Sequence, residues 1–236
     1  MCNAGQPGNH CTFQFCAMPV NKEAYQQIIQ ELGEGVVLVA VSKTKPAEDI
    51  FELYNLGHRD FGENYVQELV EKAEKLPNDI RWHFIGHLQT NKVKFIIPFV
   101  QLIQGVDSLK LLKEINKQSA KAGRVVDCLL QIHIAQEETK FGLNDSELDE
   151  VLANLEALKN VRVVGLMGMA SFTEDMDKVR KEFRRLKCIF DEAKRNHPAI
   201  HILSMGMSSD YMIAMEEGSN MVRIGSLLFG ERSPKQ

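Results

Sequence analysis

The sequence predicts an α/β protein in which eight strands and their connecting helices close into a single (β/α)8 TIM barrel. Three observations predict this fold. Short apolar, β-branched runs alternate with charged segments of helical periodicity from residue 20 onward. Repeated strand–helix units give parallel strands joined by right-handed crossovers. The length of 236 residues suits one such barrel, which commonly takes about 200 to 250 residues.

Eight runs carry the strand signal, and we expect them to form the barrel in chain order. They are VVLVAVSK (36–43), HRDFGEN (58–64), RWHFIGH (81–87), LIQGVDS (102–108), VDCLLQIHI (126–134), VRVVGLMGM (161–169), IHILSMGM (200–207) and MVRIGSLLFG (221–230). The alternative is an open doubly wound sheet, whose usual chemistry places a G-x-G-x-x-G turn after the first strand. The first run instead ends in SKTKP, without a glycine. This difference favours the barrel.

The segments between the runs show apolar stripes at helical spacing. In 174–196 the stripe lies opposite a face rich in Lys and Arg. A further helix over about 21–32 is expected to cap the bottom of the barrel before the first strand. Residues typical of helix starts precede three other segments: Pro46, Ser108, and Asp145 or Ser146.

Composition and charge exclude several classes of function. Hydrophobic content of 44% and charged content of 25% are ordinary for a soluble globular protein. The formal net charge of −4 gives no general attraction to nucleic acid or to an anionic membrane. No stretch approaches the roughly 18 apolar residues of a membrane span. We therefore expect neither a nucleic-acid partner nor a membrane partner.

The cysteines and the N-terminal segment predict a cytoplasmic protein. Cys128 and Cys188 lie in apolar sequence, which is typical of packed, reduced thiols. Residues 1–17 contain no Lys or Arg and no long apolar run, so they do not resemble a secretory signal. We expect 1–17 to be a poorly ordered extension, 18–232 to be the barrel domain and 233–236 to be a tail.

A metal site is not expected in the N-terminal segment. Its potential ligands lack the paired C-x₂₋₄-C spacing that is typical of zinc sites. These potential ligands are Cys2, His10, Cys11 and Cys16.

Polar side chains gather at the carboxyl ends of the expected strands, where barrel proteins bind their ligands. Around a glycine, SMGMSSD (204–210) offers hydroxyl groups and backbone N–H groups directly before a helical segment that starts near Asp210. Such groups bind a phosphate dianion, and the loops after the seventh and eighth strands often do so in barrels. Gly225 allows close backbone approach and Ser226 adds a donor. The alternative interpretation is a serine N-cap with turn glycines.

Lys43 is the candidate nucleophile. Strand alternation places it on the face of Val39 and Val41, which points into the barrel. Burial at the barrel mouth is expected to lower its pKa and to raise the neutral fraction that attacks an aldehyde. The alternative is a lysine that extends from the strand end to solvent. Alternation places Lys45 on the same side of the strand as Lys43, but Lys45 precedes Pro46 at the helix start and should lie outside the barrel.

Arg223 is the candidate electrostatic group of the last strand. It shares a face with Gly225, so it is expected to point toward the same ligand. A guanidinium stays protonated, and beside a pyridine nitrogen it would keep that nitrogen unprotonated and weaken the ring as an electron sink. The alternative is an ion pair with Glu63 or with another carboxylate across the barrel.

Five stretches in this order resemble the pyridoxal phosphate homeostasis family, the YggS/PROSC type, which shares the barrel of the alanine racemase N-terminal domain. The resemblance covers about residues 18–232 and is highly specific. The stretches are LVAVSKTKP (38–46), FGENYVQE (61–68), WHFIGHLQTNK (82–92), VRVVGLMGMA (161–170) and LSMGMSSDYMIAMEEGSNMVRIGSLLFGER (203–232).

The resemblance implies a pyridoxal 5′-phosphate (PLP) site. It implies that Lys43 carries PLP as an internal aldimine and that Arg223 faces the pyridine nitrogen. It also implies that Asn64, His83 and Met167 line the cofactor. The phosphate would be held by Ser208, Gly225 and Ser226. Ser204, Gly206 and Met207 are further candidate cofactor-binding residues.

The resemblance to alanine racemase raises the question of catalysis. That enzyme takes a second base, a tyrosine, from a separate C-terminal domain, and this chain ends six residues after its last run. None of the four tyrosines is expected at a strand end: they are Tyr25, Tyr54, Tyr65 and Tyr211. We therefore expect a monomeric, non-enzymatic carrier that buffers or delivers PLP, passes it transiently to apo-enzymes and affects amino-acid metabolism indirectly.

The alternative is a racemase-like enzyme with Lys43 as its only base. Lys140 is a further candidate, as a loop lysine that accepts PLP transiently.

Overall fold

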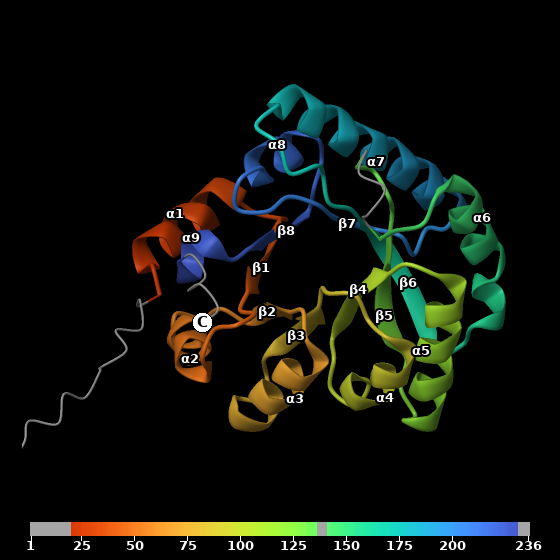
Figure 1. Ribbon diagram of the computed structural model, residues 1–236, viewed down its shortest axis with the longest axis horizontal. Coiled ribbons are helices and arrows are strands. Elements are labelled where there is room, and N and C mark those ends of the chain that lie inside the picture. Colours follow the sequence, from red (N-terminus) through yellow and green to blue (C-terminus); the bar gives the residue numbers. More distant parts are fainter. Residues whose placement is uncertain (1–19, 136–140, 231–236) are drawn as a thin grey trace, which may run out of the picture.

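The computed structural model describes residues 20–135 and 141–230, which form a closed eight-stranded barrel. Each strand pairs in parallel with the next, and the eighth pairs with the first to complete the ring (Figure 1). The predicted (β/α)8 barrel is confirmed. The segments 1–19 and 231–236, as well as Lys140, lie outside the described residues, so the predictions for the two ends and for that lysine stay untested.

Each predicted run contains its strand, but the strands are shorter than the runs, whose remaining residues form loops. The eighth run was expected to stay extended to residue 230, and this was wrong, because β8 ends before Gly225 and a short helix follows. The strands are β1 (Val37–Val41), β2 (Asp60–Glu63), β3 (Arg81–Phe84), β4 (Leu102–Val106), β5 (Val126–Gln131), β6 (Val161–Met167), β7 (Ile202–Ser204) and β8 (Met221–Ile224).

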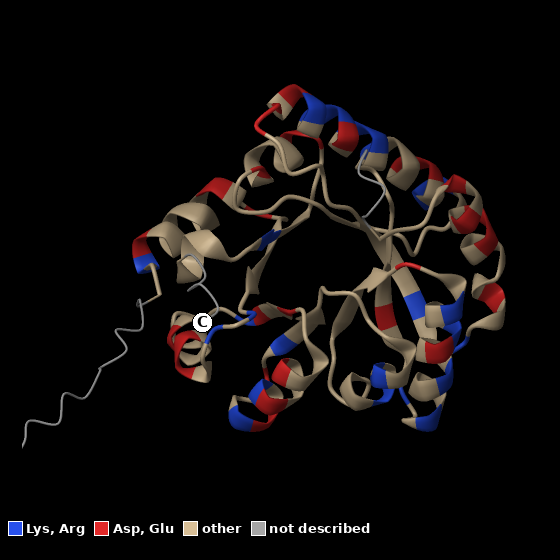
Figure 2. Ribbon diagram, in the orientation of Figure 1, with Lys and Arg blue, Asp and Glu red and all other residues tan. Residues whose placement is uncertain are grey.

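Helices surround the ring and carry their charged residues on the outside (Figures 1 and 2). They are α1 (Lys22–Leu32), α2 (Ala47–Asn55), α3 (Val66–Lys75), α4 (Val93–Ile96), α5 (Leu109–Lys121), α6 (Asp145–Ala153), α7 (Met176–Asn196), α8 (Tyr211–Glu216) and α9 (Ser226–Phe229), with short 3₁₀ turns at Thr90–Lys92 and Leu155–Ala157.

Two of the predicted helix starts shift by one position. Ser108 caps α5 as predicted, and its side chain accepts a hydrogen bond from Leu111 N at 3.3 Å. Pro46 is the N-cap of α2 rather than its first helical residue. The N-cap of α6 is Asn144, because Asn144 and Glu147 form a reciprocal capping box.

The first helix was expected to cap the bottom of the barrel, but α1 lies in the outer layer, beside α9 (Figure 1). Asn21 N donates to Leu228 O at 2.9 Å, and Lys22 pairs with Glu52 at 2.7 Å. The position follows from its amphipathic pattern, because its buried residues must face the wall of the barrel.

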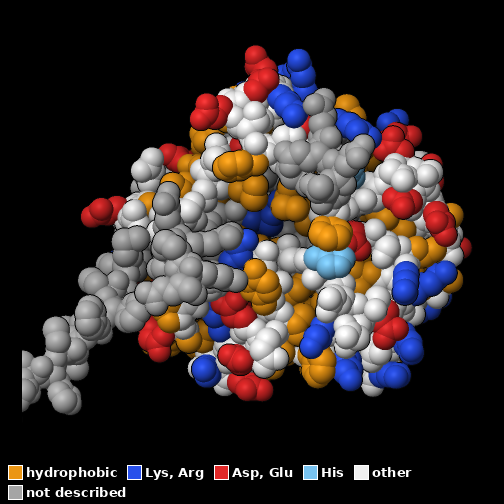
Figure 3. All heavy atoms as spheres, in the orientation of Figure 1, with side chains coloured by type: hydrophobic (Ala, Val, Ile, Leu, Met, Phe, Trp, Pro, Cys, Tyr) orange, Lys and Arg blue, Asp and Glu red, His pale blue; other side chains and the backbone are white. Residues whose placement is uncertain are grey.

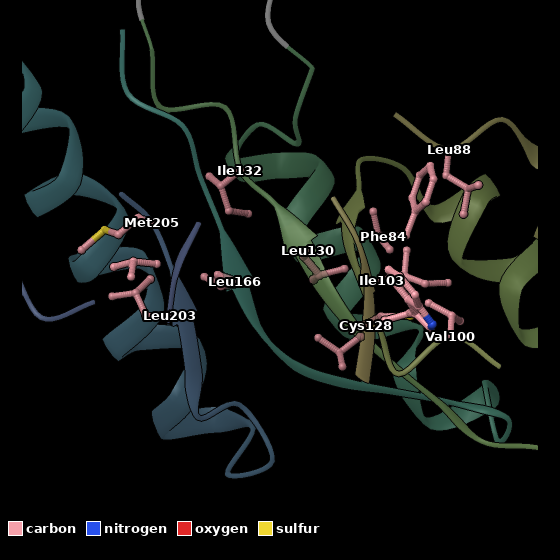
Figure 4. Close-up of a cluster of buried hydrophobic side chains, with 14 of the residues drawn as sticks. Phe84, Leu88, Val100, Ile103, Cys128, Leu130, Ile132, Leu166, Leu203 and Met205 are labelled. Atoms are coloured by element: carbon pink, nitrogen blue, oxygen red, sulfur yellow. The ribbon is translucent and has the colours of Figure 1, made fainter. Parts of the chain in front are cut away.

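Two apolar regions hold the barrel together. The larger one fills the space between strands and helices, and Figure 4 shows part of it around Phe84, Ile103 and Leu130. Each fully buried aliphatic side chain of this kind contributes about 1.5–3 kcal/mol. The smaller region lies inside the ring and consists of Val39, Leu102, Leu129, Val164, Met167 and Met221. A polar side chain inside the ring is therefore unusual, and such side chains indicate where the candidate site lies.

Both described cysteines are free thiols. Cys128 is buried, and burial raises the pKa of its thiol. Cys188 was expected to be packed but is exposed, because it lies on the outer face of α7. Within the described part of the chain, no helix is long and apolar enough to cross a membrane.

Candidate cofactor site at the carboxyl ends of the strands

The turn after β1 carries Lys43. Val39 belongs to the apolar region inside the ring, and Val41 lies on the same side of the strand. Continued alternation of side chains directs Lys43 toward the open end of the barrel at the carboxyl ends of the strands, which we call the mouth. The Lys43 side chain is half-buried. Thr44, the next residue, has a φ of 62°, a left-handed conformation that costs a non-glycine residue about 1–2 kcal/mol. The chain therefore reverses direction immediately beyond Lys43.

A buried lysine of α3 holds this turn on both sides of Lys43. Lys72 Nζ donates to Ser42 O at 2.8 Å, to Glu63 Oε1 at 2.8 Å and to Glu68 Oε1 at 2.6 Å. Glu68 Oε1 in turn accepts from Thr44 N at 2.6 Å. Charge-assisted hydrogen bonds in a buried place are the strong kind. We call Ser42, Glu63, Glu68 and Lys72 the turn-holding cluster.

Glu63 faces α3 and not the interior of the ring. Its carboxylate accepts from Ser42 Oγ at 2.6 Å as well as from Lys72. Burial raises the pKa of Glu63, and the neighbouring ammonium of Lys72 opposes that rise. The alternative in which Glu63 forms an ion pair with Arg223 is therefore wrong.

The loops after β7 and β8 meet each other and approach β1. Gly225 N donates to Ser208 Oγ at 3.3 Å. A Cβ atom at Gly225 would lie 3.2 Å from both the Cβ and the carbonyl oxygen of Val41, two residues before Lys43. Gly206, with a φ of 96°, makes the turn that follows β7. The structure thus brings Ser208 and Gly225 to the strand that carries Lys43.

The serines of these loops do not cap α8. Its N-cap is Asp210, whose Oδ1 accepts from Met207 N at 2.6 Å. Ser208 instead links the two loops, and Ser226 is exposed as the first residue of α9. The alternative of a serine N-cap is therefore wrong, and the assignment of these loops to a phosphate stays a prediction.

Arg223 lies inside the ring, as its strand parity predicts. It is 4% exposed, and its guanidinium donates to Ser204 Oγ at 2.5 Å and to Gly168 O at 3.0 Å. Both acceptors are uncharged. Burial lowers the pKa of Arg223 to about 10, and the carboxylate of Asp210 opposes this shift. The guanidinium therefore keeps its positive charge at neutral pH.

His83 and Ser204 are bonded to protein groups deep in the ring. Ser204 Oγ donates to Gln104 Oε1 at 2.7 Å. The two ring nitrogens of His83 lie 3.1 Å from Gln104 Nε2 and 3.0 Å from Asp60 Oδ1. Burial alone would raise the pKa of Asp60, but hydrogen bonds from Arg81 and His83 hold it well below its usual value. That His83 and Ser204 contact a cofactor stays a prediction.

Asn64 and Met167 complete the predicted set. Met167 is fully buried at the end of β6, inside the ring. Asn64 follows β2, and its Oδ1 is buried with no hydrogen-bond partner in the described part of the chain. A bound donor would satisfy this oxygen. Together with Lys43 and the glycine at 225, it makes the mouth suitable for a polar ligand such as PLP.

Gly86 fixes the position of Asn64. A Cβ atom at Gly86 would lie 2.3 Å from Asn64 O and 2.8 Å from Asn64 Cα. We expect Gly86→Ala to lower the free energy of unfolding by about 1–3 kcal/mol, because the backbone must shift. Gly62→Ala is the control: its Cβ would meet side-chain atoms only, Val39 Cγ1 at 2.9 Å and Ile85 Cδ1 at 3.1 Å, so a smaller loss is expected than where backbone atoms stand in the way. Urea unfolding measures the free energy of unfolding of both variants. Equal losses would show that the close approach of Gly86 to the Asn64 backbone is not decisive.

One tyrosine lies close to a strand end, at the start of helix α3. Tyr65 stands two residues after β2 and is 55% exposed. Only residues 64 and 65 separate β2 from α3, so the start of the helix lies close to the end of the strand. Two of the other tyrosines donate elsewhere, Tyr54 to Asp79 and Tyr211 to Glu31. Tyr25 packs edge-on against His58.

Viewed from one end, the molecule is hollowed at its centre, with Lys and Arg side chains inside the hollow and hydrophobic side chains around it (Figure 3). Within residues 20–135 and 141–230, no three His, Cys, Asp or Glu side chains group to hold a metal ion. The potential ligands of the N-terminal segment lie outside those ranges. Sequence analysis missed Gln104 and Lys72. The signal for Gln104 was a glutamine within the otherwise apolar run LIQGV.

A family model described as the alanine racemase N-terminal domain matches residues 21–233. The pyridoxal phosphate homeostasis protein of Aquifex aeolicus (strain VF5) is 44% identical over 215 residues, covering 89% of this chain and 94% of that protein. The chain belongs to the pyridoxal phosphate homeostasis protein family. The Homo sapiens member is 40% identical over 236 residues, covering 92% of this chain and 86% of that protein. The resemblance seen in the five sequence stretches is confirmed.

Solved structures extend this relation. PipY of Synechococcus elongatus PCC7942, determined with PLP bound, matches with a TM-score of 0.82 at 33% identity, covering 88% of this chain and 99% of that one. The alanine racemase of Clostridium difficile 630 matches with a TM-score of 0.72 at 16% identity, covering 91% of this chain and 57% of that one. At this identity the racemase shares the fold, and nothing about activity follows from it.

Proposed function

We propose that this member of the family binds PLP at the mouth of the barrel, joined covalently to Lys43, and that it buffers or delivers the cofactor. The observation that carries the proposal is the meeting of β1, β7 and β8: Gly225 packs against the strand of Lys43 and is bonded to Ser208. The PLP-bound state of PipY, a relative with 33% identity, supports the same ligand here.

Each group has a separate task in this proposal. PLP supplies an aldehyde that condenses reversibly with an amine, and a phosphate dianion. Lys43 provides the amine. Ser208, Ser226 and the backbone at Gly225 provide donors for the phosphate. Asn64, His83 and Met167, with Ser204, Gly206 and Met207, complete the surroundings of the ring and the phosphate.

Arg223 would set the electronic character of a bound pyridine ring. Its buried guanidinium retains its proton at neutral pH. Beside the ring nitrogen it would donate a hydrogen bond and keep that nitrogen unprotonated, so the ring would draw electrons weakly. A weak electron sink stabilises a carbanion poorly.

Removing Lys43 tests the covalent link. We expect the purified protein to show the visible absorbance band of a PLP imine, and we expect Lys43→Ala to lose that band completely. After borohydride reduction, mass spectrometry should place the adduct on the peptide that contains Lys43. Lys45→Ala is the matched control, since Lys45 donates to Phe229 O outside the ring. Retention of the band in Lys43→Ala, or an adduct on another lysine, would overturn the proposal.

Two further measurements separate the modes of action. If the protein buffers PLP, the release rate is independent of apo-enzyme concentration; if it hands PLP over by contact, the rate rises with that concentration. The alternative of a racemase-like enzyme predicts exchange of the α-proton of an amino acid in D₂O that Lys43→Ala abolishes. Tyr65, two residues after β2, is the residue to replace next if such exchange occurs.

A further inference from the structure

Hydrogen bonds between side chains cross the interior of the barrel. From β8 to β2, the members are Arg223, Ser204, Gln104, His83 and Asp60, and we call them the interior chain. The successive distances are 2.5, 2.7, 3.1 and 3.0 Å. Ser204 and Gln104 are fully buried, and Arg223 and His83 are 4% and 3% exposed.

The hydrogen bonds of the interior chain all run in one direction, from Arg223 as the first donor to Asp60 as the last acceptor. A guanidinium can only donate, so Ser204 Oγ accepts from Arg223 and gives its own proton to Gln104 Oε1. The opposite end of the Gln104 amide then donates to His83 Nδ1. His83 must therefore carry its proton on Nε2, which donates to the carboxylate of Asp60. Each link of the chain therefore pairs one donor with one acceptor.

The far end of the interior chain is anchored. Asp60 also accepts from Arg81 Nε at 2.8 Å and from Arg81 Nη2, a bidentate pair at the other end of the barrel. Arg81 and His83 thus share one ionised carboxylate. Arg81 therefore stabilises the carboxylate of Asp60, which accepts the hydrogen bond from His83 at the end of the chain.

Such a chain is costly unless it is complete. Inward positions of barrel strands are usually filled by Val, Ile or Leu. A buried amide, hydroxyl or imidazole without a partner costs about 1–3 kcal/mol. A fully bonded network instead holds its members in one arrangement. Gln104 is the member that joins β3 to β7, since its two amide ends contact His83 and Ser204.

We propose that Gln104 is a positioning residue of the cofactor site, which orients Ser204 and through it the guanidinium of Arg223 toward a ligand whose ring offers a nitrogen acceptor. The inference rests on the proposed function, because it takes PLP as that ligand. Gln104 also fixes the orientation of His83, because its amide donates to Nδ1 and leaves Nε2 to donate to Asp60. Gln104 thereby contributes to discrimination between a pyridine ring and a ring that lacks the nitrogen.

The test compares PLP with its 1-deaza analogue, in which a C–H group replaces the ring nitrogen. We expect the wild-type protein to prefer PLP by about tenfold, the effect of one hydrogen bond to a charged group. Gln104→Leu should bring the ratio of the two dissociation constants close to one. Gln131→Leu is the matched control: Gln131 is also a buried glutamine of the ring, but it donates to Phe141 O.

A purely structural role of Gln104 would weaken both ligands equally and leave the ratio unchanged, and this result would overturn the inference. A second readout needs no ligand. Nitrogen-15 NMR of the ligand-free protein should show a proton on Nε2 and none on Nδ1 of His83 in the wild type, and a changed signal in Gln104→Leu. An Nδ1–H tautomer in the wild type would also overturn it.

Failure of the inference is distinguishable from failure of the proposed function. If the wild-type protein does not bind PLP, or if Lys43→Ala keeps the absorbance band, the proposed function fails and the inference about the ligand fails with it. If the wild type binds PLP through Lys43 but all three proteins show the same preference for the ring nitrogen, only the role of Gln104 is wrong.

Discussion

Replacing Lys72 by Met is expected to lower the free energy of unfolding by about 3–5 kcal/mol, because it leaves a buried carboxylate without its cation. Glu63 is fully buried, and Lys72 Nζ lies 2.8 Å from its Oε1. The substitution also removes the donor to Ser42 O and the partner of Glu68, which holds Thr44 N. Urea unfolding of the ligand-free protein measures the loss.

Two further variants test this explanation. Lys75→Met, an exposed lysine of the same helix, should change stability by no more than about 0.5 kcal/mol. The double variant Lys72→Met with Glu63→Leu should recover most of the loss, since a neutral pair of similar volume no longer contains an unpaired charge. If Lys72→Met is as stable as Lys75→Met, the turn-holding cluster does not stabilise the barrel.

Stability is expected to fall by about 3 kcal/mol as the pH decreases from about 6.5 to 4, through His58 alone. His58 is 6% exposed, and burial lowers its pKa to about 4. Its Nε2 lies 2.8 Å from Asp60 O, and it packs edge-on against the rings of Tyr25 and Phe61. The folded protein therefore resists protonation of this imidazole.

The sign follows from the difference between the two states. Above pH 6.5 the imidazole of His58 is neutral in both states, and its contribution to stability is fully present. Between 6.5 and 4 only the unfolded chain takes up the proton, so the unfolded state gains stability. His58→Gln retains an N–H donor without this titration. The wild-type minus variant difference in unfolding free energy, measured at pH 7 and pH 4, should change by about 3 kcal/mol; a constant difference would contradict the assignment.

The strand order and the strand-end residues were predictable because both follow from periodicity. Parallel strands in a closed ring place their carboxyl ends together, so Lys43, Asn64, Ser208 and Gly225 had to share one face. Strand parity also placed Arg223 inside the ring. These inferences need only the alternation of side chains along a strand and the connectivity of the barrel.

Side-chain partners were not predictable, because they depend on register and on helix orientation. Glu63 alternates to the outer face of β2, where α3 presents Lys72, and no local pattern in the sequence connects the two. The interior chain joins residues up to about 100 positions apart, Gln104 and Ser204 among them. Tyr65 lies near a strand end because only residues 64 and 65 separate β2 from α3.

Closure of the ring has a consequence for biosynthesis. Val39 on the first strand pairs with Arg223 on the last, so the proposed pocket draws on segments that emerge from the ribosome at opposite times. Joining them closes a loop of more than 180 residues, an entropic cost that only the completed chain can offset. A nascent polypeptide that has not yet reached the eighth strand lacks the last of the loops that we propose for the phosphate, so we expect the cofactor to bind only after synthesis of the chain is complete.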